Sequence, residues 1–219
     1  MTTPAPRVSL LGTSAVLFEA PGETTLDTQR LIWALASTAG GWDGVREAVP
    51  GMNNLMLTFA KPPRDPQAFG ARITEAWAKL EPLALNGRCI ELPVTYGGDA
   101  GPHMADVVAH TGLSVDDIVS IHTAPTYPVY ALGSHPGYCY LGGMDARIAT
   151  PRRTTPVVKI PGGAVSIGGG QTGVSASDGP SGWNTIGSTA MAFFDINRAE
   201  PALLRPGDSI RFTAQKVVR

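Results

Sequence analysis

The chain has 219 residues, enough for one large or two small domains, and its 43% hydrophobic and 16% charged residues favour a packed globular protein. The net charge of −1 leaves no basic surplus to neutralise phosphates, which argues against a nucleic-acid partner. No apolar stretch approaches the roughly 20 residues of a membrane span and no signal-peptide pattern opens the chain. We therefore expect a soluble, cytoplasmic protein without a membrane partner. Its two cysteines, Cys89 and Cys139, form neither a zinc pattern nor a disulfide framework.

Strand and helix signals alternate over the first half of the chain. Thr25 can cap a helix that ends at Gly40-Gly41, and Asp65 can cap a second one, with Pro66 at its first helical position. Short apolar runs predict strands around these helices, at residues 8–11, 15–18, 44–49, 54–59 and 88–94. This ββαββαβ order predicts a small two-layer α+β domain over residues 1–95.

Helical periodicity disappears in the second half after two short helices. The first is expected at residues 102–110, and the second runs from a capping box of Ser114 with Asp117 to about His122. Thirteen of the 26 glycines lie between residues 133 and 187, where they separate short β-type runs. Many short strands with glycine turns predict a closed or nearly closed β-barrel over residues 96–219, without a long helix beyond residue 128.

The loop from Leu132 to Gly143 is the most informative stretch of the second half. Its glycines let the backbone approach a ligand or adopt a positive φ, and its histidine and two tyrosines add imidazole and hydroxyl groups at the same place. The alternative is an ordinary barrel loop with aromatic packing, and the chemistry alone does not choose between the two. The candidate binding residues in this loop are Gly133, Pro136, Gly137, Tyr138 and Tyr140.

A glycine-rich segment at residues 168–173 follows three cations. Consecutive backbone N–H groups in such loops can hold phosphate or carboxylate oxygens, although the segment is neither a P-loop nor a dinucleotide fingerprint. The cations would complement a bound anion. The alternative is that the cations pair with surface carboxylates and that the glycines only turn corners. The candidate residues are Arg152, Arg153, Lys159, Gly170, Gln171 and Thr172.

The four histidines show no metal-ligand spacing, so no metal site is expected. His103, His110 and His122 fall at predicted helix ends, where a histidine usually caps the helix or lies on the surface. Only His135 lies within the glycine- and aromatic-rich loop. Serine-nucleophile signatures are absent. Trp183, which lies on no helical apolar face, is a candidate pocket wall.

Seven motifs follow one another in a fixed order along the chain. They are Leu92-Pro93-Val94-Thr95-Tyr96-Gly97-Gly98, His110-Thr111-Gly112-Leu113-Ser114, the loop from Leu132 to Gly143, Ala149-Thr150-Pro151-Arg152-Arg153, Gly170-Gln171-Thr172-Gly173, Gly182-Trp183 and Leu204-Arg205-Pro206-Gly207-Asp208. In this order they resemble the small subunit of 5-oxoprolinase, a family also called allophanate hydrolase subunit 1. They are also similar to one half, subdomains C and D, of the carboxyltransferase domain of urea carboxylase.

The resemblance implies a small α+β N-terminal domain followed by a cyclophilin-like β-barrel. It also implies a larger partner subunit of related barrel fold, a third subunit in the oxoprolinase version, and a working site at the shared surface. ATP bound by the complex would drive opening of the 5-oxoproline lactam to L-glutamate. Phosphorylation of the lactam oxygen would activate this poor electrophile, so catalysis would consist mainly of positioning and of neutralising oxyanions. His135 would then act as acid or base, and Gln171 would orient the substrate.

Other functions stay open. An allophanate- or urea-type carboxyltransferase subunit would use the same fold, and a non-catalytic inhibitor of a sensor histidine kinase would use the barrel as a binding surface. A prolyl isomerase follows from fold analogy alone. The joint presence of Pro136-Gly137, Arg152-Arg153 and Gln171-Thr172 favours the enzyme, because a binding surface does not require all three. Departures from the family pattern fall at Ser134, His135, Cys139 and Val157, and they bear on substrate identity more than on fold.

Overall fold

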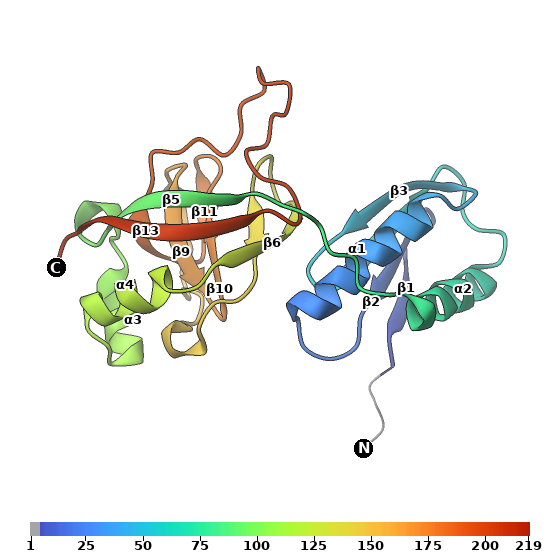
Figure 1. Ribbon diagram of the computed structural model, residues 1–219, viewed down its shortest axis with the longest axis horizontal. Coiled ribbons are helices and arrows are strands. Elements are labelled where there is room, and N and C mark those ends of the chain that lie inside the picture. The colour runs from blue at the N-terminus through green and yellow to red at the C-terminus, as the bar shows by residue number, and fades with distance from the viewer. Residues whose placement is uncertain (1–4) are drawn as a thin grey trace. The chain divides into compact units, whose positions relative to one another are not determined.

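The computed structural model describes residues 5–219, and this part of the chain folds into two compact units that divide between residues 85 and 86 (Figure 1). Within the described residues, the first unit contains a four-stranded sheet and two helices. The second contains a seven-stranded sheet, a two-stranded ribbon and two short α-helices. None of the helices described is long and apolar enough to span a bilayer.

The first unit is a layer of two helices packed on an antiparallel sheet of order β1-β2-β4-β3. Its elements are β1 (Arg7–Leu11), β2 (Ala15–Glu19), α1 (Leu26–Gly40), β3 (Val45–Pro50), β4 (Asn54–Phe59) and α2 (Pro66–Lys79). Both helices start where the sequence predicts, because the side chains of Thr25 and Asp65 accept hydrogen bonds from backbone amides of the first turn.

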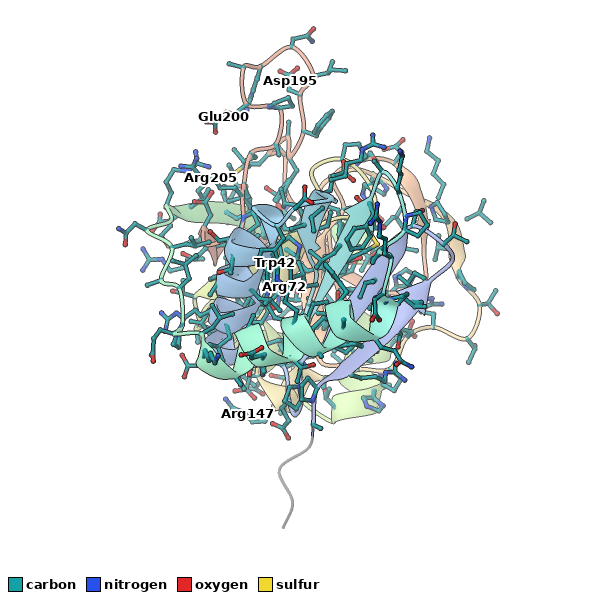
Figure 2. All side chains as sticks on the ribbon, turned by 90° about the vertical axis from the view of Figure 1, so that its right-hand side faces the viewer. Trp42, Arg72, Arg147, Asp195, Glu200 and Arg205 are labelled. Carbon is teal, nitrogen blue, oxygen red and sulfur yellow. The ribbon has the colours of Figure 1, made fainter. Side chains whose placement is uncertain are left out.

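The core of the first unit lies between the sheet and its helices. Alternate strand residues such as Phe18 and Leu57 point to one face of the sheet and pack with Ile32 of α1 and Ile73 of α2. Since both helices contribute to one core, they cover the same face. On the surface of this unit the guanidinium of Arg72 lies over the Trp42 ring, 4.0 Å from its centre (Figure 2).

The second unit is built on a sheet that nearly closes into a barrel. The strand order is β10-β9-β12-β5-β13-β6-β7, and the two end strands, β7 and β10, lie against each other. The strands are β5 (Cys89–Tyr96), β6 (Tyr127–Leu132), β7 (Cys139–Leu141), β9 (Ala164–Gly168), β10 (Gln171–Val174), β12 (Asn184–Ser188) and β13 (Ser209–Val217). Neighbouring strands run antiparallel, except that β5 and β13 are parallel (green and red in Figure 1).

Short elements complete the second unit. Helices α3 (Met104–Thr111) and α4 (Val115–Thr123) precede β6, and the ribbon consists of β8 (Val157–Ile160) and β11 (Gly179–Ser181). The predicted capping box forms at the start of α4, because the side chains of Ser114 and Asp117 each bond the other's backbone amide. Beyond residue 128 the only helix among the described residues is one 3-10 turn, Ala146–Ile148. An α+β unit followed by a β-barrel is therefore confirmed as the fold class.

The strand predicted at residues 88–94 belongs to the barrel and not to the first domain. As β5, it pairs with β12 on one side and β13 on the other. Its alternate residues Leu92, Val94 and Tyr96 enter the barrel core. The two units therefore divide between Leu85 and Asn86, earlier than the boundary expected at residue 95. The local sequence predicts a strand here but does not indicate that its partners come about a hundred residues later.

Candidate functional site

A pocket of about 190 Å³ opens in the barrel unit. It lies where the loop between β6 and β7, the β9–β10 hairpin and the segment from β11 to β12 meet. Among the residues that line it are His135, Tyr138, Ser166, Gly173, Ser181 and Trp183. Two residues proposed from sequence, His135 and Tyr138, thus line the same pocket as Trp183, which the sequence indicates as a pocket wall.

Two glycines make room for the aromatic walls of this pocket. A Cβ added at Gly168 would lie 2.5 Å from the Trp183 indole, and one at Gly173 would lie 2.9 Å from the Tyr138 hydroxyl. Between them Gly169, at φ +63, bonds Thr150 through both its amide and its carbonyl. The glycine-rich segment therefore seats an indole and turns a hairpin. The sequence suggests a row of free amides here, but the Gly169 amide already donates to the Thr150 carbonyl and is not available to an anion.

The loop that carries His135 is held by its own backbone. The Gly133 amide donates to the Tyr138 carbonyl at 3.2 Å, and the Tyr138 amide donates to the His135 carbonyl at 3.1 Å. Gly137 has φ +80, and a Cβ there would lie 2.7 Å from the Phe193 carbonyl oxygen, so only glycine fits. The rings of His135 and Tyr138 consequently pack together, with centres 5.0 Å apart.

Tyr138 is a hydrogen-bond donor at neutral pH. Burial raises the pKa of Tyr138 to about 12, with smaller contributions from Tyr140 and Cys139, and the positive charge of Arg152 opposes them. The Tyr140 ring packs edge-on against Tyr138, 5.2 Å between centres, without lining the pocket. Nε2 of His135 is buried and has no hydrogen-bond partner among the described residues.

The neighbouring arginines Arg152 and Arg153 face different places. The guanidinium of Arg152 lies 5.6 Å from the centre of the Trp183 ring, so its charge is close to the pocket. Arg153 forms an ion pair with Asp106 and lines a separate groove with His110. Its amide also donates to the Gly182 carbonyl at 2.7 Å. Neither arginine lines the pocket itself, but the guanidinium of Arg152 lies over a lining residue, whereas that of Arg153 does not.

The remaining predicted residues do not line the pocket. Lys159 pairs with Asp178 at 3.0 Å on the exposed ribbon, and Thr172 is buried in the barrel core with only 1% of its surface exposed. Gln171 is half-buried at the start of β10, opposite Gly168. Pro136 is exposed, and open space surrounds the Cα of Gly170. Of the three segments expected to converge, the loop contributes His135 and Tyr138 to the pocket and the hairpin contributes Gly173, while Lys159 and Arg153 lie elsewhere. A shared functional site of these segments stays a prediction.

Three serines contribute hydroxyl groups that no sequence motif indicates, and they are Ser166, Ser175 and Ser181. The Ser166 hydroxyl, on β9, forms a hydrogen bond with the Thr185 hydroxyl at 3.1 Å. The Ser181 hydroxyl accepts a hydrogen bond from the Trp183 backbone amide at 3.1 Å and so anchors the backbone that carries the indole. Serines scattered among glycines are typical of turns. No local signal marks these as pocket residues.

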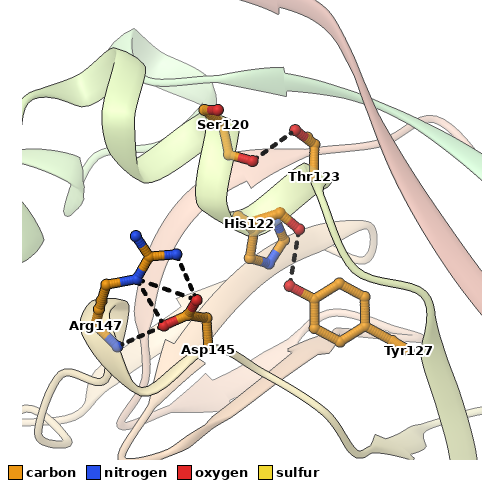
Figure 3. Close-up of polar contacts among 6 residues, drawn as sticks. All are labelled: Ser120, His122, Thr123, Tyr127, Asp145 and Arg147. Carbon is orange, nitrogen blue, oxygen red and sulfur yellow. Dashed lines mark hydrogen bonds and ion pairs between the residues drawn. The ribbon is translucent and has the colours of Figure 1, made fainter.

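From its place at a predicted helix end, His122 is expected to cap the helix or to lie on the surface. In the structure it is fully buried. Its Nδ1 lies 2.8 Å from the Tyr96 hydroxyl and its Nε2 lies 2.8 Å from the Thr172 hydroxyl. The Tyr127 hydroxyl donates to the His122 carbonyl at 2.7 Å (Figure 3). Burial lowers the pKa of His122 to about 3, so the imidazole is neutral. The motif residue Thr172 is thus a structural partner of His122.

No three histidine, cysteine, aspartate or glutamate side chains of residues 5–219 come together in a way that could hold a metal ion. The histidines at 103, 110 and 122 are engaged elsewhere or exposed. The pocket chemistry consists of hydroxyls, one imidazole, two aromatic walls and a nearby guanidinium. Such a set can bind and orient a small polar molecule with an anionic group.

Comparison with known proteins identifies the family. The profile of the carboxyltransferase domain, subdomain C and D, matches residues 6–204, and the chain belongs to this family. A curated relative, a 5-oxoprolinase subunit from Escherichia coli O157:H7, is 43% identical over 210 residues, which cover 96% of each chain. The resemblance inferred from the seven motifs is confirmed.

Two solved structures show the same fold inside longer chains. TTHA0988 covers 94% of this chain at 29% identity with a TM-score of 0.75, and this chain spans 40% of TTHA0988. Urea carboxylase of Kluyveromyces lactis covers 98% with a TM-score of 0.78, and this chain spans 22% of that enzyme. At 17% identity, the second likeness concerns the fold alone.

Proposed function

We propose that the chain is the small subunit of an ATP-dependent 5-oxoprolinase and acts with a larger subunit of related barrel fold. The observation that carries the proposal is the 43% identity, across 96% of both chains, to a relative that is named as a 5-oxoprolinase subunit. The pocket between Tyr138 and Trp183 is this subunit's contribution to the binding of 5-oxoproline.

The size of the pocket supports a small substrate. The pocket has a volume of about 190 Å³ and is partly open to solvent. A five-membered lactam with one carboxylate is of that size, whereas a nucleoside triphosphate is several times larger. We assign ATP to a site outside this pocket, on the larger subunit or between the subunits. This assignment separates the lactam from the nucleotide, which the sequence treats as one mixed set of binding residues.

The groups around the pocket suit a cyclic amide with an acidic substituent. Trp183 and Tyr138 offer flat walls for the ring, and the protonated Tyr138 hydroxyl can donate to the lactam oxygen. Arg152 can pair with the carboxylate from its position over Trp183. His135 also lines the pocket, and its ring packs on Tyr138.

The reaction follows from the weakness of a lactam as an electrophile. The lactam oxygen attacks the γ-phosphorus of ATP, the bond to the β-phosphate breaks and ADP leaves. Water then adds to the activated carbon and the ring C–N bond breaks with protonation of the nitrogen. A second water hydrolyses the resulting acyl phosphate to glutamate and phosphate. The subunits act mainly by alignment and by stabilising the anionic oxygens.

The test is reconstitution. The chain is co-expressed with the larger subunit and the third oxoprolinase subunit, and glutamate and phosphate are measured with 5-oxoproline and ATP. Glutamate formation that requires both ATP and this chain is expected. Separate reactions with urea and allophanate probe the carboxyltransferase alternative. An assembled complex that releases no glutamate from 5-oxoproline but turns over allophanate would overturn the proposal.

A further inference from the structure

A chain of hydrogen bonds crosses the interior of the barrel from β5 to β9. The Tyr96 hydroxyl meets Nδ1 of His122 at 2.8 Å, and Nε2 of His122 meets the Thr172 hydroxyl at 2.8 Å. Thr172 in turn donates to the carbonyl oxygen of Ser166 at 3.2 Å. None of these four residues is more than 5% exposed. The hydrogen-bond chain thus links four elements, β5, α4, β10 and β9, through the interior of the barrel.

The direction of the chain is fixed by Thr172. Its hydroxyl has one hydrogen, which it donates to Ser166, so it must accept the hydrogen of His122 Nε2. Nδ1 of His122 is then unprotonated and accepts the hydrogen of the Tyr96 hydroxyl. Every polar group in the chain is satisfied, as buried groups require. Loss of one member would leave its neighbour unpaired in an apolar interior.

The hydrogen-bond chain from Tyr96 to Ser166 ends at the floor of the pocket. Ser166 and Gly173 face each other in the β9–β10 hairpin, and both line the pocket. Gly173 lies so close beneath Tyr138 that a Cβ there would be 2.9 Å from the hydroxyl. The positions of Thr172 and its neighbour Gly173 therefore set where the Tyr138 hydroxyl can lie. A shift of β10 by a few tenths of an ångström would move this hydroxyl relative to Trp183.

We propose that His122 is a positioning residue for the pocket, which it holds in shape by fixing β10 and β9 through Thr172. It touches no ligand itself. The imidazole acts as a rigid spacer with one donor and one acceptor, a combination that few other side chains offer at this length. The effect of His122 on substrate binding rests on the proposed function, whereas its effect on the shape of the pocket does not.

Three variants separate positioning from simple stabilisation. Thr172→Val removes the hydroxyl and breaks the link, whereas Thr172→Ser keeps it. Tyr127→Phe is the matched control, because it also removes a buried hydrogen bond to His122, but one that ends at the backbone carbonyl and does not lead to the pocket. In the assembled complex, Thr172→Val should raise KM for the lactam about tenfold or more. Thr172→Ser and Tyr127→Phe should keep KM near the wild-type value.

A second measurement needs no activity. Fluorotryptophan labels the four tryptophans, and the Trp183 resonance is assigned by its loss in Trp183→Phe. Thr172→Val should shift this fluorine resonance, while Thr172→Ser and Tyr127→Phe should leave it in place. If Thr172→Val does not fold, Tyr96→Phe breaks the same chain and keeps the aromatic ring.

The outcomes distinguish the two proposals. An unmoved Trp183 resonance in folded Thr172→Val or Tyr96→Phe, or an equal shift in Tyr127→Phe, overturns the positioning role. A wild-type complex that does not hydrolyse 5-oxoproline overturns the proposed function instead and leaves the fluorine result interpretable.

Discussion

The carboxylate of Asp208 is held by Arg88 across 120 positions of sequence. The guanidinium donates to Oδ2 at 2.7 Å, and the Arg88 backbone amide donates to Oδ1 at 2.8 Å. Asp208 also accepts from the Arg205 amide at 3.2 Å and is fully buried. This contact joins the residue before β5 to the turn before β13 and so sets the register of the two parallel strands.

Replacement of Asp208 by asparagine should destabilise the barrel unit by about 2 kcal/mol, because an amide cannot satisfy all three donors; the half-exposed Arg88 limits the loss. Calorimetric unfolding at neutral pH measures the change. Asp116→Asn is the control, since Asp116 forms an exposed ion pair with Arg219 and its loss should cost little. Equal destabilisation by both variants would contradict the structural role of Asp208.

Low pH should weaken the contact between Asp208 and Arg88, because it protonates the carboxylate. Burial alone would raise the pKa of Asp208, but the hydrogen bonds from Arg88 and Arg205 outweigh burial and hold the pKa below its usual value. A group whose pKa is lower in the folded state stabilises the protein above its unfolded pKa, about 3.9 for aspartate. That stability is lost as the pH falls through the folded pKa. Below about pH 4, the gap in unfolding free energy between wild type and Asp208→Asn should therefore narrow.

Gly168→Ala should distort the pocket, because its Cβ would lie 2.5 Å from the Trp183 indole and one of the two must move. We expect kcat/KM of the assembled complex to fall by about tenfold or more. Gly170→Ala, two residues away in the same turn, meets no atom within 4 Å and should retain activity. Similar activity in the two variants would show that the position of the indole does not matter.

Arg152 and Arg153 should respond differently to substitution by glutamine. Arg152→Gln should raise KM for the lactam with little change in melting temperature, since it removes a charge beside Trp183. Arg153→Gln should lower the melting temperature and leave KM close to that of the wild type, because the Arg153 side chain is only 29% exposed and loses packing as well as its ion pair with Asp106. Steady-state kinetics of the complex and thermal melts of the chain test the pair. The opposite pattern would mean that the carboxylate is bound in the Arg153 groove.

The isolated chain should not hydrolyse 5-oxoproline with ATP. The pocket is assigned to the lactam, whereas the ATP that activates the lactam is assigned to a site outside the pocket. A serine–histidine contact borders the pocket, with 3.4 Å between Ser134 Oγ and His135 Nδ1, but without phosphorylation the lactam stays a poor electrophile. The chain should co-elute with the larger subunit in size-exclusion chromatography at micromolar concentration, as expected of an interface above ~1,000 Å². Separate elution, or full turnover by the chain alone, would contradict this prediction.

The elements of this fold could be predicted where the signal is local. The caps at Thr25 and Asp65 and the capping box at Ser114 fix helix starts within a few residues, and a single sequence suffices to find them. The membership of β5 could not be found in this way. Strand propensity is the same in either unit, and only the pairing with β13 decides which sheet contains it.

The candidate site could also be predicted only where the sequence signal is local. Trp183 and His135 stand out because an aromatic and an imidazole among glycines have no local structural role. Gly168 and Gly173 suggest anion binding in sequence, but in space they leave room for rings. His122 suggests a helix cap until Tyr96 and Thr172 close around it from distant strands. Tertiary contacts outweigh the local pattern at each of these positions.

The parallel pairing of β5 with β13 also sets an order of events on the ribosome. The first unit, described from residue 5 to residue 85, can fold as soon as it emerges, because its sheet is complete within that length. The barrel must wait for residues 209–217, which at ~5–20 residues per second takes on the order of ten seconds more. During that delay the apolar side chains of Leu92, Val94 and Tyr96 remain uncovered. We therefore expect chaperones to bind the exposed apolar side chains of the second unit during synthesis, when the first unit has already folded.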